Sequence, residues 1–227
     1  LAVRGWLARD YADSLFREAG LDLDGLRAQA RRRDFLPVEL PIAFTADIPV
    51  ASKTTVSHNV LAKLTGATHP DETIMFGAHW DAFGIGAPDA EGRVARSGAN
   101  DDALGTAGVL ELARVFAAGP RPQRTLVFAL WTAEERGLLG SLDYAERPLY
   151  PLERTVANLT LDILQTAGPA RDVLLVGEGQ GDLEDDLARA AAAQGRVVTP
   201  EAPRWGPTTG SGSTAVVRRA IAGLPVT

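Results

Sequence analysis

Histidine and acidic residues stand where several expected secondary-structure elements begin or end. Three apolar runs read as strands and end in "MFGAHWD", "FALWTAEE" and "ANLTLD", and the turn "SGANDDALG" precedes an expected helix. The residues concerned are His79, Asp81, Asp101, Asp102, Glu134, Glu135 and Asp162. The carboxyl ends of parallel strands lie at one edge of a sheet, so we expect these side chains to converge there.

Such a cluster of like charges needs a cation, because neighbouring carboxylates oppose each other's ionisation. The chain has no cysteine, so its metal ligands would be histidine and carboxylates, a set that suits zinc. Two-metal sites with ions about 3.5–4 Å apart are typical of aminopeptidases. Taken singly, each residue has a simpler explanation: Asp162 could cap a turn, Asp101 could cap a helix, and His79 could be a buried core histidine.

The elements expected around these residues alternate between strands and helices. Strands are predicted at 73–81, 124–131, 154–164 and 171–179, and helices at 101–118, from about 134, and at 181–194. This order predicts an α/β fold, a three-layer sandwich whose central mixed, mostly parallel β-sheet is flanked by helices. Such a sheet would bring the site residues to one edge.

The first 66 residues follow a different pattern. Helices are expected over Gly5–Ala19 and Leu23–Arg33, and alternating apolar residues from Phe35 to Gly66 predict two long strands meeting near Pro49–Thr54. We therefore expect a helical segment over residues 1–35 that precedes a catalytic domain over residues 36–227.

Four motifs in a fixed order resemble the zinc-dependent aminopeptidases of metallopeptidase family M28, whose active sites hold two cooperating zinc ions. They are "HWDAFG", "SGANDDALGTAGVLELAR", "TAEERGLLGS" and "NLTLD", and the similarity runs from about His58 to Thr199. The resemblance implies the zinc-exopeptidase fold and a peptide substrate with a free N-terminus. It also implies an extracellular or periplasmic location, although this chain shows no signal peptide.

The resemblance assigns a role to each matching position. It implies that His79 and Asp162 bind the first zinc, Glu135 binds the second, and Asp101 bridges both. Glu134 would be the general base that takes a proton from the attacking water and passes it to the leaving amine. Asp81 would be the acid that orients His79 through its other ring nitrogen. Asp102 would have a local, supporting role.

The family pattern breaks near the C-terminus, where the resemblance implies one more histidine ligand for the second zinc. The chain has "AGLPV" at 222–226, but its only other histidines are His58 and His69, both expected on the surface. Ser211, Ser213 or water could replace the ligand, the chain could be truncated or altered at its end, or the protein could be a degenerate enzyme with one metal. We expect an occupied first site and a weak or empty second one.

These readings leave three functions open. The first is a zinc aminopeptidase, and the second is a catalytically impaired relative that acts as a binding module. The third is a single-zinc acyltransferase that cyclises N-terminal glutamine. Retention of Glu134 favours the first, and the missing histidine favours the second.

Composition excludes other classes of protein. The net charge is −6 with a pI near 5.1, and "ARRRD" at 30–34 is the one basic run, so a nucleic-acid partner is not expected. No apolar run reaches the length of about 18 residues that predicts a membrane span. The chain begins at Leu1 and ends at Thr227, which indicates a protein incomplete at both ends. No residue pattern indicates an oligomeric state.

Overall fold

The computed structural model describes residues 5–164, 166–175, 181–200 and 223–226. The chain forms two compact units, Leu1–Thr54 and Thr55–Thr227, and each is considered by itself. The division expected from the sequence, a helical segment over 1–35 and a catalytic domain over 36–227, stays a prediction.

The first unit contains the two expected helices, α1 (Arg9–Glu18) and α2 (Leu23–Gln29). The Asp22 side chain caps α2 by accepting a hydrogen bond from the main-chain N–H of Asp24, the usual arrangement at a helix start. Arg9 joins the helices through its guanidinium, which contacts the carboxylates of Asp13 and Asp24 at 2.9 and 2.7 Å. Both pairs are exposed, so they contribute little to stability.

The prediction of two long strands between Phe35 and Gly66 was wrong. Residues 35–59 contain no strand, and only β1 (Val60–Leu64) forms in this stretch. Alternating apolar residues form a strand only where a partner strand and a surface to cover are present. Leu36, Phe44 and Val50 are instead 74–81% exposed.

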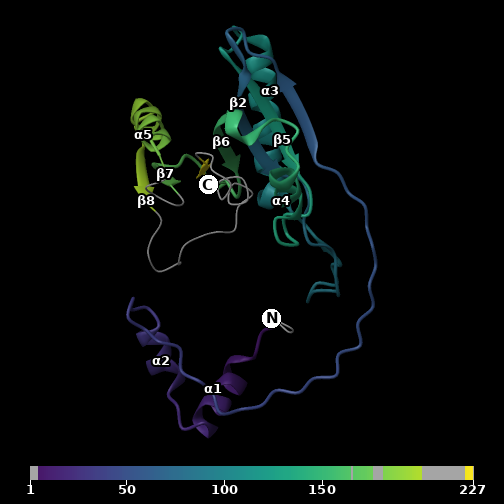
Figure 1. Cartoon of the computed structure of the whole chain (residues 1–227), viewed down its shortest axis with the longest axis vertical. Helices are drawn as coiled ribbons and strands as arrows, with labels where there is room; N and C mark the ends of the chain where they lie inside the picture. The colour runs from purple at the N-terminus through teal and green to yellow at the C-terminus, as the bar shows by residue number, and fades with distance from the viewer. Residues whose placement is uncertain (1–4, 165, 176–180, 201–222, 227) are drawn as a thin grey trace. The chain divides into compact units, whose positions relative to one another are not determined.

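The second unit is built on a seven-stranded sheet with the order β1-β5-β2-β6-β9-β7-β8 (Figure 1). Four of the six neighbouring pairs are parallel, and the pairs β1–β5 and β9–β7 are antiparallel. The remaining strands of this sheet are β2 (His69–His79), β5 (Arg124–Trp131), β6 (Thr155–Leu161), β7 (Asp172–Leu175), β8 (Val197–Pro200) and β9 (Gly223–Val226). The expected mixed, mostly parallel sheet is confirmed.

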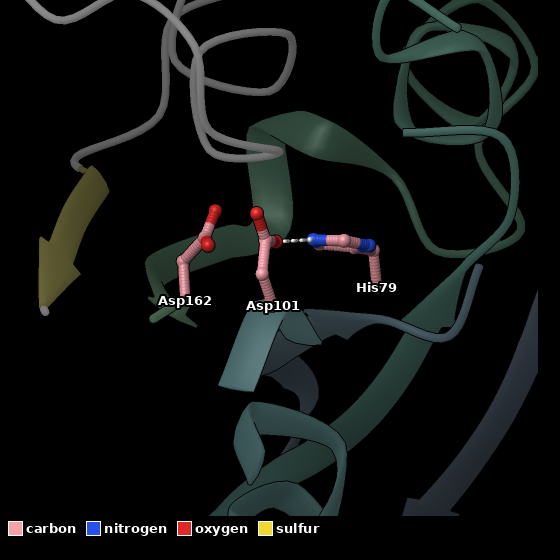
Figure 2. A group of neighbouring side chains, drawn as sticks. All are labelled: His79, Asp101 and Asp162. Atoms are coloured by element: carbon pink, nitrogen blue, oxygen red, sulfur yellow. Dashed lines mark hydrogen bonds and ion pairs between the residues drawn. The ribbon is translucent and has the colours of Figure 1, made fainter. Parts of the chain in front are cut away.

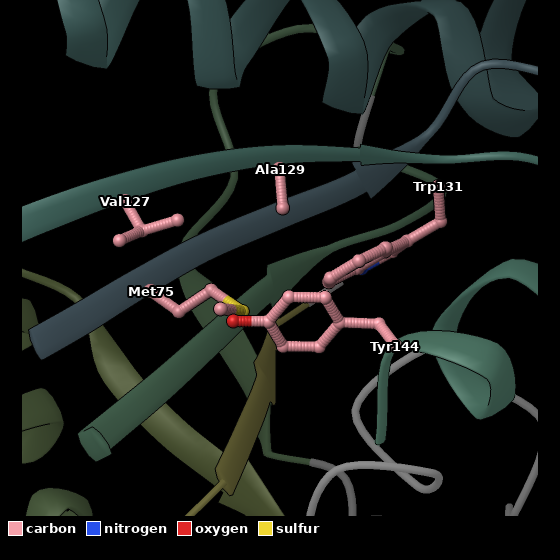
Figure 3. Close-up of a cluster of buried hydrophobic side chains, with 5 residues drawn as sticks. All are labelled: Met75, Val127, Ala129, Trp131 and Tyr144. Carbon is pink, nitrogen blue, oxygen red and sulfur yellow. The ribbon is translucent and has the colours of Figure 1, made fainter. Parts of the chain in front are cut away.

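Alternate side chains of β5 cover opposite faces of the sheet. Leu126 and Phe128 pack in a cluster with Val109 of helix α3 (Leu104–Ala118). Val127, Ala129 and Trp131 face the other way and pack with Tyr144 of α4 (Leu139–Glu146), whose ring centroid lies 5.2 Å from that of Trp131 (Figure 3). Helices therefore cover both faces of a buried parallel core, as the α/β sandwich prediction required.

Two helices begin later than predicted, and both differences concern site residues. Asp101 and Asp102 have non-helical backbone angles within a short π-type turn, η1 (Ala99–Ala103), and the regular helix starts only at Leu104. Glu134 precedes a turn, and α4 starts at Leu139. The acids therefore lie on irregular backbone at helix entrances rather than inside helices.

The smaller elements complete the unit. β3 (Gly84–Ile85) and β4 (Ala95–Arg96) form a short hairpin, η2 (Leu152–Arg154) is one turn of 3-10 helix, and α5 is Leu183–Ala193. The predicted strand at 171–179 forms over Asp172–Leu175, and residues 176–180 lie outside the described part of the chain.

Candidate metal centre

Three of the expected metal ligands meet at the carboxyl edge of the sheet. His79 is the last residue of β2, Asp162 follows the end of β6, and Asp101 lies in η1. One ligand atom from each lies within 4.8 Å of the others. Figure 2 shows the Asp101 side chain between those of Asp162 and His79, and Asp101 Oδ1 lies 3.0 Å from His79 Nε2. We call these three residues the ligand trio.

His79 is held from both its main chain and its ring. Its side chain is 3% exposed, its N–H donates to Asp102 Oδ2 at 3.0 Å, and its carbonyl accepts from the Thr106 hydroxyl at 2.9 Å. Nδ1 lies 3.1 Å from the main-chain oxygen of Asp81. A carbonyl oxygen only accepts, so Nδ1 donates to it, and Nε2, which faces the Asp101 carboxylate, is the ring nitrogen that would bind a metal.

Asp102 links the end of β2 to the start of α3. One carboxylate oxygen accepts from His79 N–H and the other accepts from Gly105 N–H at 2.9 Å. The residue is only 1% exposed, and this burial raises the pKa of its carboxyl to about 7. The supporting role expected from the sequence stays a prediction.

Asp81 has partners on both sides. Its side chain lies 3.6 Å from His79 Nδ1, farther than its own main-chain oxygen. The same carboxylate accepts hydrogen bonds from the main-chain N–H groups of Glu134 and Glu135, at 2.9 and 3.3 Å. Asp81 therefore connects the histidine to the two glutamates, a link that the sequence did not indicate.

Glu134 lies beside the trio without being one of its members. Its Oε2 is 3.9 Å from His79 Nε2, and its side chain is 11% exposed. Burial raises the pKa of this carboxyl to about 7, and the nearby carboxylates of Asp162 and Glu135 add to the rise. A carboxyl with this pKa can both accept and release a proton near neutral pH.

Glu135 and Asp162 carry further signs of a cation site. Glu135 Oε1 is buried and has no hydrogen-bond partner among the described residues, which is unusual for a buried carboxylate oxygen. Burial raises the pKa of both Glu135 and Asp162, and the Asp101 carboxylate raises both further. A bound divalent cation relieves this repulsion and satisfies the free oxygen, so the donor set fits zinc.

The remaining candidate ligands are not at this centre. His58 and His69 are exposed and lie outside the trio, as expected for surface histidines. Ser211 and Ser213, the expected substitutes for a C-terminal histidine, lie outside the described residues. Sequence reasoning also missed Asn59, which hydrogen-bonds the loop that carries the glutamates; a single asparagine before a strand gives no periodic signal.

Sequence relatives of the chain include peptidases. Aminopeptidase NAALADL1 of Mus musculus is 40% identical over 113 residues, which cover 47% of this chain and 14% of that protein. A probable zinc metalloprotease of Pyrenophora teres f. teres is 37% identical over 105 residues, covering 46% of this chain and 22% of that protein. The matched stretches thus span less than a quarter of either relative.

Solved structures share the fold. A zinc aminopeptidase from Bacillus subtilis matches with a TM-score of 0.58 and 23% identity over 74% of this chain and 39% of that chain. A glutaminyl cyclase from Bacteroides thetaiotaomicron matches with a TM-score of 0.57 and 20% identity over 74% of this chain and 63% of that chain. The model of the family described as Peptidase family M28 matches residues 59–224. This match covers most of the chain together with all the residues of the centre, and the chain belongs to peptidase family M28.

Proposed function

We propose that the centre is a zinc-dependent aminopeptidase site that removes N-terminal residues from peptides. The observation that carries the proposal is the ligand trio with the Glu134 carboxylate 3.9 Å from His79 Nε2. A metal-binding histidine with a protonatable carboxylate beside it is the pairing that metal-assisted hydrolysis needs. Membership of the family and the names of the sequence relatives support the same activity.

His79, Asp101 and Asp162 would hold the first zinc, and Asp101 with Glu135 would contribute to a second. Zinc, when bound, polarises the scissile carbonyl and makes water a stronger acid. The chain's own residues prepare the site for it. The main-chain oxygen of Asp81 accepts a hydrogen bond from His79 Nδ1, and the Asp102 carboxylate accepts one from the His79 main-chain N–H.

Glu134 would move the proton of the reaction. Oε2 accepts a proton from the attacking water and then donates it to the nitrogen of the departing amine. The hydrogen bond from its own N–H to Asp81 holds the residue beside the trio.

The second zinc should bind more weakly than the first. The trio supplies three ligands to one position, whereas Asp101 and Glu135 are the ligands proposed for the other, and no histidine occurs after His79. Calorimetric titration of the metal-free chain with zinc should show one tight and one weak site. Two equally tight sites would contradict the proposal.

The substrate would be a peptide with a free N-terminus, and the place of action would be extracellular or periplasmic, as the resemblance to the family implies. In the described residues, no helix is both long and apolar enough to cross a membrane.

The test measures bound zinc per chain and, in the same preparation, hydrolysis of a leucine arylamide with added zinc. The proposal expects turnover that disappears in Glu134→Gln while zinc remains bound. Bound zinc without Glu134-dependent turnover would contradict the proposal and would fit a binding module instead.

A cyclising acyltransferase is the remaining alternative, because the glutaminyl cyclase fold is as similar to this chain as that of the aminopeptidase. A peptide with N-terminal glutamine separates the two. An aminopeptidase releases free glutamine, and a cyclase releases ammonia and leaves a peptide of unchanged length.

A further inference from the structure

The two glutamates lie on a short loop that closes on itself; it is taken here as Thr132–Gly140, which includes the first two residues of α4. Gly140 N–H donates to the Thr132 carbonyl at 3.0 Å, and Leu139 N–H donates to the Ala133 carbonyl at 3.1 Å. Within the loop, Ala133 and Leu138 have φ angles of 53° and 62°, in the left-handed region. A residue with a Cβ loses about 1–2 kcal/mol there, so the loop needs contacts that hold it in place.

Asn59 supplies two such contacts with one side chain. Its Oδ1 accepts a hydrogen bond from Thr132 N–H at 3.1 Å, and its Nδ2 donates to the Gly140 carbonyl at 2.9 Å. Thr132 and Gly140 are the two ends of the loop, so one planar amide bridges both. The fit is close, because a Cβ at position 140 would collide with Thr132 O and Asn59 Oδ1.

The contacts of Asn59 are separate from the metal ligands. Among the described residues, its side-chain hydrogen bonds reach only Thr132 and Gly140. Asp81 holds the middle of the same loop through the N–H groups of Glu134 and Glu135, but its main chain also contacts the ring of His79. Substitution of Asn59 should therefore loosen the loop without directly changing the trio.

We propose that Asn59 is a positioning residue that keeps the Thr132–Gly140 loop closed and so holds the Glu134 carboxylate beside His79. The inference rests on the proposed role of Glu134 in proton transfer. A general base that moves by even a fraction of an ångström loses reach to the proton that it must take. The trio comes from β2, η1 and the end of β6, which lie outside this loop in the chain.

The test compares Asn59→Ala with the unchanged chain in the zinc-loaded state. Amide hydrogen exchange should become faster in Thr132–Gly140 and stay unchanged in β2 and β6. The kcat for a leucine arylamide should fall about 10–100-fold, as for other groups that orient an active-site residue, with KM within about twofold. Zinc affinity of the tight site should not change.

Two further variants separate positioning from general damage. Ser57→Ala removes a hydroxyl contact of 2.6 Å to the Thr132 side chain but leaves the loop's main chain bonded, so it should behave like the unchanged chain. Asn59→Asp keeps the acceptor for Thr132 N–H but sets a carboxylate oxygen against the Gly140 carbonyl, so its kcat should fall and its loop exchange should rise at least as far as in Asn59→Ala.

Unchanged exchange in the loop of Asn59→Ala would overturn the proposal. So would a variant in which zinc affinity, KM and exchange throughout the sheet all change together, because that pattern indicates loss of the fold. If the unchanged chain hydrolyses no substrate, the proposed function fails, and the exchange of the loop still decides whether Asn59 holds it closed.

Discussion

The ligand trio and the glutamate loop lie at the same edge of the sheet, but their backbones are built differently. His79 ends an eleven-residue strand that pairs with parallel strands on both sides, and Asp162 follows one of those strands. The loop at 132–140 has no such ladder, contains two non-glycine residues with positive φ, and is held by side chains of Asp81 and Asn59. His79 and Asp162 are positioned by regular structure, Asp101 lies on the irregular turn η1, and the glutamate loop is positioned by individual hydrogen bonds.

The difference follows the two tasks proposed for these regions. Metal ligands need fixed donor atoms, which strand ends in a buried sheet provide. A proton-transferring carboxylate must avoid full solvation and yet lie next to the ligands, and a loop that folds back over the sheet edge meets both needs. The comparison predicts that substitutions in the trio affect binding of the tight zinc first, and that substitution of Glu134 in the loop affects turnover first.

His79→Ala should have the largest effect. Removing the imidazole deletes the nitrogen donor of the trio, and turnover should become undetectable. Zinc affinity should fall by more than about 10–100-fold, which is the loss expected when a residue that only hydrogen-bonds a metal ligand is removed. Equilibrium dialysis with zinc measures the change. His69→Ala is the matched control, because this exposed histidine starts the same strand and lies outside the trio. Tight zinc binding by His79→Ala would refute the assignment of the trio.

Glu134→Gln should separate the two regions most clearly. The amide keeps the size of the side chain and cannot take a proton, so kcat should fall about 10²–10⁴-fold while the tight zinc remains. Steady-state kinetics and metal analysis of one preparation give both values. Glu146→Gln, at the exposed end of α4, should change neither. If Glu134→Gln lost its zinc together with its activity, Glu134 would belong among the ligands instead.

Most of the sheet could be predicted because its signal is local. The runs that became β2, β5 and β6 are apolar for longer than one face requires, which is typical of strands buried on both faces. The prediction of strands before Val60 failed because its signal is not local. The stretch alternates between apolar and polar residues, but whether it pairs as a strand depends on partners elsewhere in the chain.

The site residues could be placed near one another from strand ends alone, but their partners could not. The sequence placed His79, Asp101 and Asp162 at one edge, and the structure brings them within 4.8 Å. It did not show that Asp81 bonds the glutamate N–H groups, nor that Asn59 bridges the loop, because both contacts join segments more than 50 residues apart. Contacts of this kind depend on the folded backbone and have no sequence spacing to reveal them.

The pH dependence of stability should also reflect the buried acids. Burial raises the pKa of Glu134 and Asp102 to about 7, so the folded, metal-free protein binds protons more tightly than the unfolded chain. For a raised carboxyl, stability is highest when both states are protonated and falls as pH rises from about 4 to about 7. The raised pKa of His79, held up by the neighbouring carboxylates against its own burial, acts in the same direction.

The melting temperature of the metal-free protein should therefore be higher at pH 5 than at pH 7.5, and zinc should raise it more at pH 7.5. Differential scanning calorimetry with and without zinc measures both differences. Glu134→Gln removes one of the titrating groups and should flatten the metal-free profile. If the metal-free protein gained stability as the pH rises from 5 to 7.5, exposed acids and not the buried centre would dominate the pH dependence of its stability.

Ala133→Gly should have the smallest effect and tests whether the loop is strained. Glycine adopts the φ of 53° at this position without a Cβ clash, which saves about 1–2 kcal/mol, and its greater freedom in the unfolded chain costs about 0.5–1 kcal/mol. The net gain in unfolding free energy should be about 0.5–1 kcal/mol, measured by urea denaturation. Ala188→Gly, in the exposed part of α5, is the same substitution at a helical position and should destabilise by about 1 kcal/mol. If both variants lost stability equally, the loop would be relaxed, and Asp81 and Asn59 would be holding a conformation that the backbone prefers by itself.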